Sequence, residues 1–195
     1  MEKLTLKDIK DLRDYERSRE EFRDKIITLK KIRRISIGPL VTLLFENRET
    51  MLFQIQEMAR AEKIMSDDGI QEELDAYNPL IPGAGELSAT LFIELTSKDE
   101  LIEWLPKLVG IERSLELLIG TSQISAPSIP EQLHEQMLTR DDVTASVHYI
   151  HFEIPKPAQA EFLNGPVILR CNLETYRHEL ELSKEVLAEL SADMA

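Results

Sequence analysis

The chain has 195 residues, of which 43% are hydrophobic and 30% charged, and its formal net charge is −13. This length and composition are typical of one ordinary globular domain and exclude a disordered chain. The excess of acid argues against a nucleic-acid-binding protein, because phosphate contacts need a basic face. We therefore expect a single domain over residues 1–195, with a helical N-terminal segment (1–34) and a strand-rich remainder (35–195).

The chain lacks the signals of export and of membrane insertion. Its longest apolar runs, such as residues 39–45, are far shorter than the ~20 residues that span a bilayer. Its first residues are too charged for a signal peptide. Cys171 is the only cysteine, so neither an intrachain disulfide nor a cysteine-held metal cluster can form within one chain. We expect a cytoplasmic protein that acts neither on nucleic acid nor in a membrane.

The basic residues are concentrated near the N-terminus. Residues 17–34 hold eight bases and three acids, a local charge of +5 that leaves −18 for the rest of the chain. The default interpretation is a solvated helix face, with bases near the C-terminal end of the helix, where they interact favourably with its dipole. The other interpretation is a docking patch for an acidic partner or ligand.

Hydrophobic periodicity predicts helices and strands along the whole chain. Thr5 and Asp8 resemble a capping box at the start of the first helix, Gly38-Pro39 separates two short strands, and Pro79 ends the helix before it. Helices are expected near residues 6–15, 18–32, 49–65, 67–78, 97–109, 130–138, 158–163 and 184–194. Strands are expected near residues 35–37, 40–46, 87–95, 114–120, 143–154, 165–173 and 176–182.

Residues 121–130 are polar and contain two prolines, which favours a loop. The alternation of elements predicts an α+β fold with a helical N-terminus. Its core is expected to be a twisted, mainly antiparallel sheet of about five to seven strands with helices packed against it.

The helix predicted over residues 49–65 carries the best candidate for a site. On a helical wheel, Glu62 falls between Met51 and Ile55, within a face expected to be buried. An ionised carboxylate in a core face is costly unless it is paired or hydrogen-bonded. Glu62 should therefore have a partner, a raised pKa or a water-filled pocket, unless it lies near enough to the helix end to reach solvent. Glu57 lies in a second, smaller apolar strip. The expected buried face consists of Met51, Leu52, Ile55, Met58, Ala59 and Met65.

A histidine in the strand over residues 143–154 is the candidate partner of Glu62. Alternation places His148 on the same face as Ile150 and Phe152. A buried His–Glu pair would satisfy both groups and could perform acid–base chemistry or hold a metal ion. The other interpretation is that His148 bonds a backbone carbonyl in the core.

Other signatures of chemistry are weak or absent. Glu131 and His134 match one Glu-x-x-His element of di-iron proteins, but such a site needs two of these elements and two further glutamates. Residues 83–85 lack the third glycine of a dinucleotide fingerprint, and neither a P-loop lysine nor a Gly-x-Ser-x-Gly elbow is present. Cys171 has no motif that places a base beside it, so packing is expected. No cofactor is evident, and a bound metal ion stays open, with Glu62 and His148 as its candidate ligands.

Residues 43–64, 69–82 and 144–154 resemble bacterial proteins grouped as domain of unknown function 3501, and the resemblance extends over essentially the whole chain. The resemblance implies no established activity. Genes of that family stand near genes for rubrerythrin-like and iron–sulfur oxidoreductase proteins, which implies association rather than mechanism. Many relatives have arginine where this chain has His151, which puts any role of that position in doubt. The matching residues are Gln54, Gln56, Glu57, Arg60, Glu62, Gln71, Glu72, Glu73, Leu74, Asp75, Tyr77, Asn78, Pro79 and His148.

Two functions of different classes fit these observations. The first is an accessory or interaction protein that works beside redox proteins of the rubrerythrin-like or iron–sulfur oxidoreductase kind. The second is a small enzyme, or a metal- or small-molecule-binding protein, that uses a pocket of Glu57, Glu62 and His148 with Arg60 or Tyr77. The residues define neither a substrate nor an oligomeric state, and a homo-oligomer stays open.

Overall fold

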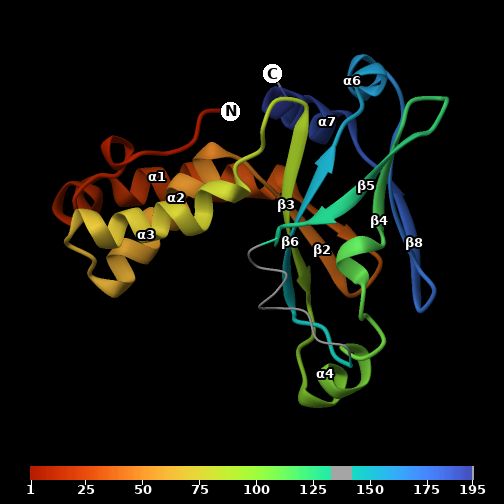
Figure 1. The fold of residues 1–195 in the computed structure, drawn as a ribbon, viewed down its shortest axis with the longest axis horizontal. Helices are drawn as coiled ribbons and strands as arrows, with labels where there is room; N and C mark the ends of the chain where they lie inside the picture. Colours follow the sequence, from red (N-terminus) through yellow and green to blue (C-terminus); the bar gives the residue numbers. More distant parts are fainter. Residues whose placement is uncertain (133–141, 195) are drawn as a thin grey trace.

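The structure, a computed structural model that describes residues 1–132 and 142–194, has an α+β fold (Figure 1). An eight-stranded antiparallel sheet with the order β1-β2-β3-β6-β5-β4-β7-β8 curves until it is nearly barrel-shaped. The strands are β1 (Arg34–Ile37), β2 (Val41–Glu46), β3 (Glu86–Ile93), β4 (Leu115–Ile119), β5 (Ile124–Pro130), β6 (Val147–Glu153), β7 (Val167–Leu173) and β8 (Tyr176–Glu181). The α-helices are α1 (Leu12–Arg33), α2 (Arg48–Glu62), α3 (Asp67–Tyr77), α4 (Lys98–Trp104), α6 (Lys156–Phe162) and α7 (Lys184–Ser191). Short 3₁₀ helices are η1 (Leu6–Asp8), η2 (Asn78–Leu80), η3 (Ile111–Arg113) and η4 (Ala192–Met194).

The expected strand number was too low because β5 was taken for a loop. β5 contains Pro127 and Pro130, which have no N–H to donate to a ladder. The strand tolerates them because it changes partner along its length. Its first half pairs with β4, up to the pair Pro127–Glu116, and its second half, from Ser128 to Pro130, pairs with β6.

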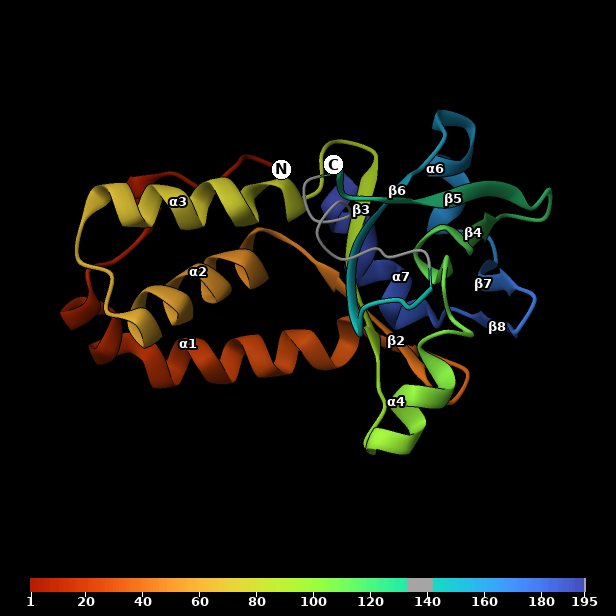
Figure 2. The ribbon, with the colours of Figure 1, turned by 60° about the horizontal axis from the view of Figure 1, so that its bottom comes forward.

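Helices α1, α2 and α3 form an arm that projects from one side of the sheet (Figures 1 and 2). The two separate helices predicted within residues 6–32 are instead the short η1 and one continuous α1. Asp11 caps the start of α1, where its side chain accepts hydrogen bonds from the backbone N–H groups of Arg13 and Asp14. A small core separate from that of the sheet holds the arm together; it consists of Leu4, Met51, Ile55, Leu74, Leu80 and Ile81.

Helix α2 ends three residues before the predicted point. Lys63 adopts left-handed backbone with φ of 57°, which closes the helix after Glu62. Of the expected buried face, Met51, Ile55 and Ala59 are buried, but Met65 lies beyond the helix and is 83% exposed. The prediction was wrong at that end because the wheel was continued past the last helical residue.

Other elements follow the sequence with adjusted ends. Helix α4 stops at Trp104 instead of continuing to residue 109, and Ser183 caps α7 as expected. The helix predicted over 130–138 falls mainly outside the described residues, and so does His134 of the Glu-x-x-His element. Within residues 1–132 and 142–194, no helix is both long and apolar enough to cross a bilayer.

The two outer strands of the curved sheet meet at the turn between β1 and β2. The Tyr176 hydroxyl, at the start of β8, donates to the carbonyl oxygen of Ile37 at 2.8 Å. The hydroxyl oxygen of Tyr176 also accepts from the backbone N–H groups of Leu40 at 2.8 Å and Val41 at 3.2 Å. Gly38 lies in this turn with φ of 67°, where a Cβ atom would be 2.6 Å from the Tyr176 hydroxyl oxygen.

Candidate functional site

Glu62, the first residue singled out by the sequence, reaches solvent. It is the last residue of α2, it is exposed, and it makes no hydrogen bond or ion pair with any described residue. Partial burial, and after it the negative charge of Glu62, raises the pKa of Glu73 on α3. Of the two interpretations of Glu62, the solvated one is therefore correct.

His148 lies in the core of the sheet, on the same face of β6 as Ile150 and Phe152, as the alternation predicts. Its Nε2 atom is 2.7 Å from the Thr144 hydroxyl and 3.0 Å from the carbonyl oxygen of Ala145. The expected pair of His148 with Glu62 is wrong. His148 is buried within the sheet, whereas the carboxylate of Glu62 points into solvent on the arm.

Glu57 joins α2 to α1. Its carboxylate accepts two hydrogen bonds from the Arg19 guanidinium, at 2.7 and 2.8 Å, and one from the Tyr15 hydroxyl at 2.7 Å. Hydrogen bonding to Arg19 is the largest influence on the Glu57 carboxyl and holds its pKa below the ordinary value, while burial raises the pKa of Tyr15. Arg60, one turn along α2, forms an exposed ion pair with Glu16 on α1. These groups hold two helices together.

We call the contacts of Glu57 with Arg19 and Tyr15 the Glu57 clamp. We expect its contribution to stability to depend on pH. The pKa of Glu57 is lower in the folded chain than in the unfolded chain. Its carboxylate therefore stabilises the folded state at pH values above the ordinary carboxyl pKa of 4.5. This contribution is lost as pH falls through the lowered pKa. We expect Glu57→Gln to reduce the free energy of unfolding at pH 7 by about 1–2 kcal/mol, and the difference from wild type to shrink as pH falls below 4.5, both measured by urea denaturation. The control Glu62→Gln, on the same helix, should change it by less than about 0.5 kcal/mol. A pH-independent loss in Glu57→Gln would contradict the assignment.

The basic run over residues 17–34 is largely neutralised within the chain. Its ion pairs are Arg17–Asp14, Arg19–Glu57, Lys25–Glu49, Arg33–Glu189, Arg33–Asp193 and Arg34–Glu94. The ammonium of Lys30 lies 5.8 Å from the centre of the Phe53 ring. Such internal pairing favours the interpretation of a solvated helix face over that of a docking patch.

The structure does not form the expected pocket of Glu57, Glu62 and His148. Across residues 1–132 and 142–194, no three His, Cys, Asp or Glu side chains are grouped so that they could hold a metal ion. Cys171 is buried in the core of the sheet, and burial raises the pKa of its thiol. This position agrees with the packing role expected for it.

Tyr77, the fifth candidate residue, lies near Tyr149. Tyr149 belongs to a different group of polar residues, on the outer face of the sheet. We define the Glu46 cluster as Glu46 on β2, Ser88 and Thr90 on β3, and Tyr149 on β6. Cross-strand pairing brings them together: Glu46 is opposite Ser88, and Thr90 lies between Leu44 and Tyr149. Burial is the largest of the effects that raise the pKa of Tyr149, followed by the nearby Tyr77 and Glu46.

The polar atoms of the Glu46 cluster are only partly satisfied. Glu46 is 3% exposed and Ser88 1% exposed. The Thr90 hydroxyl donates to Oε1 of Glu46 at 2.7 Å. Within the described part of the chain, Oε2 of Glu46 and the hydroxyl of Ser88 have no hydrogen-bond partner. Buried polar groups without a partner are rare in folded proteins, so these two atoms mark the cluster as a candidate binding site.

Two neighbouring polar residues, His151 and Glu86, lie close to each other. Nδ1 of His151 is 3.1 Å from Oε1 of Glu86, and the backbone N–H of Gly83 donates to Oε2 of Glu86 at 2.7 Å. The hydrogen bond to His151 is the largest influence on Glu86 and lowers its pKa. A cation at position 151 therefore has a carboxylate partner in this fold.

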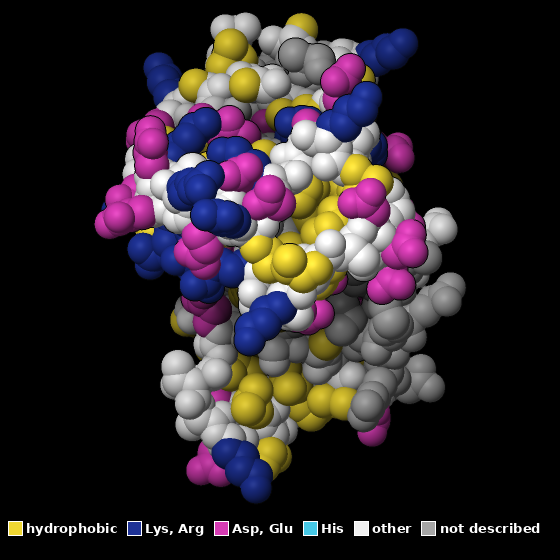
Figure 3. All heavy atoms as spheres, turned by 90° about the vertical axis from the view of Figure 1, so that its left-hand side faces the viewer, with side chains coloured by type: hydrophobic (Ala, Val, Ile, Leu, Met, Phe, Trp, Pro, Cys, Tyr) yellow, Lys and Arg dark blue, Asp and Glu magenta, His cyan; other side chains and the backbone are white. Residues whose placement is uncertain are grey.

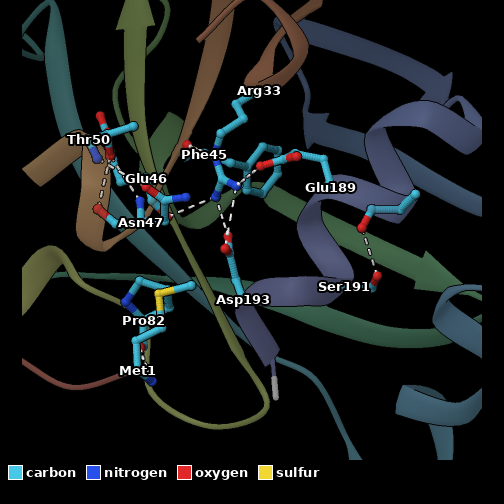
Figure 4. A network of polar contacts seen from close by, with 11 residues as sticks. Met1, Arg33, Phe45, Glu46, Asn47, Thr50, Pro82, Glu189, Ser191 and Asp193 are labelled. Carbon is cyan, nitrogen blue, oxygen red and sulfur yellow. Dashed lines mark hydrogen bonds and ion pairs between the residues drawn. The ribbon is translucent and has the colours of Figure 1, made fainter. Parts of the chain in front are cut away.

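Arg33, at the end of α1, fixes the backbone that carries Glu46 (Figure 4). Its guanidinium is fully buried and donates to the carbonyl oxygens of Phe45 at 2.8 Å and Glu46 at 3.1 Å. It also donates to Glu189 at 3.0 Å and forms an ion pair with the buried Asp193. The end of β2 is thereby tied to both α1 and the C-terminal helices.

A groove opens at the tip of the arm, the end of the molecule seen in Figure 3. It has a volume of about 700 Å³ and lies between η1, the start of α1 and the α2–α3 connection. Hydrophobic side chains form its floor, and both basic and acidic ones border it, as Figure 3 shows for this end of the molecule. The hydrophobic lining consists of Leu6, Ile9, Leu12, Ala59, Ile64, Met65 and Ile70, and the charged lining of Lys10, Asp11, Arg13, Glu16 and Asp67.

Comparison with known proteins agrees with the resemblance seen in the sequence. The profile of a family described as "Protein of unknown function (DUF3501)" matches residues 3–194. The chain belongs to the DUF3501 family. A crystal structure of a protein of unknown function from Burkholderia pseudomallei is similar to it, with 33% identity, a TM-score of 0.91 and full coverage of both chains. No curated protein matches.

In this DUF3501 protein, sequence reasoning missed the Glu46 cluster. The strand signals were correct on both sides of it, and Ser88 and Thr90 alternate with apolar residues as on a half-buried strand. Only the register between β2 and β3 brings Glu46 next to Ser88, and a single sequence does not encode that register visibly. Tyr77 was the predicted site residue nearest to the cluster, but it was selected for the pocket of Glu57, Glu62 and His148.

Proposed function

We propose that this DUF3501 protein is an accessory protein that docks onto a redox protein through the groove at the tip of its helical arm. The observation that carries the proposal is the apolar floor of this groove, with Met65 83% exposed beside it. Apolar surface bordered by charged side chains is typical of protein–protein interaction sites. An exposed methionine suits such a site because its flexible thioether adapts to different partner surfaces.

The shape of the arm supports this function. Its helices are held by their own small core and by the Glu57 clamp, so the arm keeps its form without a partner. Its tip lies at the end of the molecule away from the sheet (Figure 2). A rigid projecting element can present an anchor residue to another protein at little cost in conformational entropy.

The class of partner rests on the resemblance to the family. The gene neighbourhood that the resemblance implies favours a rubrerythrin-like protein or an iron–sulfur oxidoreductase. The mixed charges around the groove favour a partner surface in which an apolar side chain is flanked by both acidic and basic residues.

The proposal is tested by measuring binding of the purified protein to the rubrerythrin-like and iron–sulfur proteins encoded beside its gene. Met65→Glu places a charge in the lining of the groove, and we expect it to weaken binding at least about tenfold, because central anchors contribute ≥ ~2 kcal/mol. Ile102→Glu is the matched control, since Ile102 is an equally apolar side chain on α4 and is 65% exposed. It should bind as wild type. Absence of binding by wild type, or equal binding by all three proteins, would refute the proposal.

A further inference from the structure

Two neighbouring buried atoms in the Glu46 cluster have hydrogen-bonding capacity that no described residue uses. Oε2 of Glu46 and the hydroxyl of Ser88 have no hydrogen-bond partner among the described residues, although both side chains are at least nine-tenths buried. The two residues are directly opposite each other on β2 and β3, where side chains on one face lie within about 5 Å at Cβ. Leaving both groups unsatisfied would be costly.

The chemistry of the two atoms restricts the occupant. A carboxylate only accepts hydrogen bonds, whereas a hydroxyl both donates and accepts. Thr90 already satisfies Oε1 of Glu46. The occupant must therefore donate at least one hydrogen bond to Oε2 and can donate a second to Ser88.

The charge around the site restricts the occupant further. Arg33 bonds Glu46 only through the backbone oxygen, and its guanidinium is engaged by Asp193 and Glu189. His151, which is opposite Ser88 on β6, has its Nδ1 atom 3.1 Å from Oε1 of Glu86. Within the described part of the chain, no ion pair joins a cationic side chain to the carboxylate of Glu46. A buried charge is stable only when it is paired or well hydrogen-bonded.

We infer that the Glu46 cluster binds the ammonium or amine group of a small organic ligand, at a site distinct from the groove of the arm. An ammonium group donates to Glu46 Oε2 and to Ser88 and compensates the buried charge. Tyr149 lies near the carboxylate and near Tyr77, and a phenol ring adds a favourable surface for a cation. A divalent metal ion fits less well, because it needs several oxygen ligands of which the cluster offers one carboxylate.

The test uses methylammonium as the probe. The thermal unfolding midpoint of the full chain is measured against methylammonium chloride, with sodium chloride at matched ionic strength as reference. We expect a saturable rise for wild type. Tetramethylammonium has the same charge but no N–H group, and it should give no rise beyond the sodium reference.

Two variants identify the site. Each is compared with itself with and without the probe, so that its own change in stability cancels. Glu46→Gln removes the charge and should weaken the apparent affinity by about tenfold or more, because hydrogen bonds to charged groups are strong. Ser88→Ala should weaken it less. An unresponsive wild type, equal responses to the two ammonium ions, an unchanged affinity in Glu46→Gln, or a crystal soaked in methylammonium that shows only a bridging water molecule would overturn the inference.

Discussion

Replacing Arg33 with alanine is expected to destabilise the fold by roughly 3–5 kcal/mol, which is the usual cost of removing one partner of a buried ion pair. The loss is large because Arg33 is fully buried and its guanidinium serves several acceptors at once. Without it, the carboxylate of Asp193 remains buried with no cation, and the carbonyl oxygens of Phe45 and Glu46 lose their donors.

The neighbouring residue provides a matched control. Arg34 forms an ion pair with Glu94, but both side chains are nearly half exposed, at 45% and 47%. Exposed pairs contribute little, so Arg34→Ala should cost less than about 1 kcal/mol. Urea denaturation of both variants at pH 7 measures the difference. Equal losses would show that burial of Arg33 does not matter for stability.

The Arg33 variant should also respond to pH in a defined direction. Burial already raises the pKa of Asp193 above its ordinary value of 3.8. Removing the guanidinium raises it further, so that the folded variant binds a proton more readily than its unfolded chain does. Its stability relative to wild type should therefore improve as pH falls from 7 towards 4. No change over this range would contradict the proposed role of Asp193.

Arg33 also shows what the sequence could not indicate. In the sequence it is one of eight bases in residues 17–34, and nothing local distinguishes it from the exposed Arg34. Its burial depends on the C-terminal residues Glu189 and Asp193, which lie 156 and 160 positions away. Charge patterns predict a solvated helix face well. They do not identify the one charged residue of that helix that a distant segment of the chain covers.

The elements with a strong local signal were predicted correctly. Strand β6 was identified from its alternation, and His148 lies on the buried face as expected. The errors lie where tertiary contacts outweigh local preference. β5 keeps two prolines within a sheet by changing its partner. Glu62 was placed in a core face, but it is the last residue of α2, which Lys63 closes with left-handed backbone, and there it reaches solvent.

The candidate site shows the same limit. Glu57 was singled out by its position between apolar residues of one strip, and it does have a specific partner, but that partner is Arg19 on another helix. Glu46 and Ser88 become neighbours only through the register of β2 and β3. A buried polar cluster built across strands therefore needs the fold before it can be recognised.

Replacing Gly38 with alanine is expected to cost about 2–5 kcal/mol, because two effects add. Its φ of 67° is left-handed and strains any residue with a Cβ atom. The new methyl group would also lie 2.5 Å from the ring of His178 and 2.6 Å from the Tyr176 hydroxyl oxygen. Gly110→Ala separates the two effects, since Gly110 has φ of 85° but no described atom within 4 Å of the place that a Cβ atom would take. It should lose only about 1–2 kcal/mol.

The Tyr176 hydroxyl cannot move aside for the new methyl group without losing its three hydrogen bonds to the β1–β2 turn. Tyr176→Phe removes those bonds directly. If the two substitutions damage the same contact, the double variant should lose less stability than the sum of the single losses. Additive losses would show that the two substitutions act on separate contacts. β1 and β8 are not paired with each other in the described sheet. Losses smaller than the sum would therefore mean that this tyrosine and glycine together hold the two outer strands near each other.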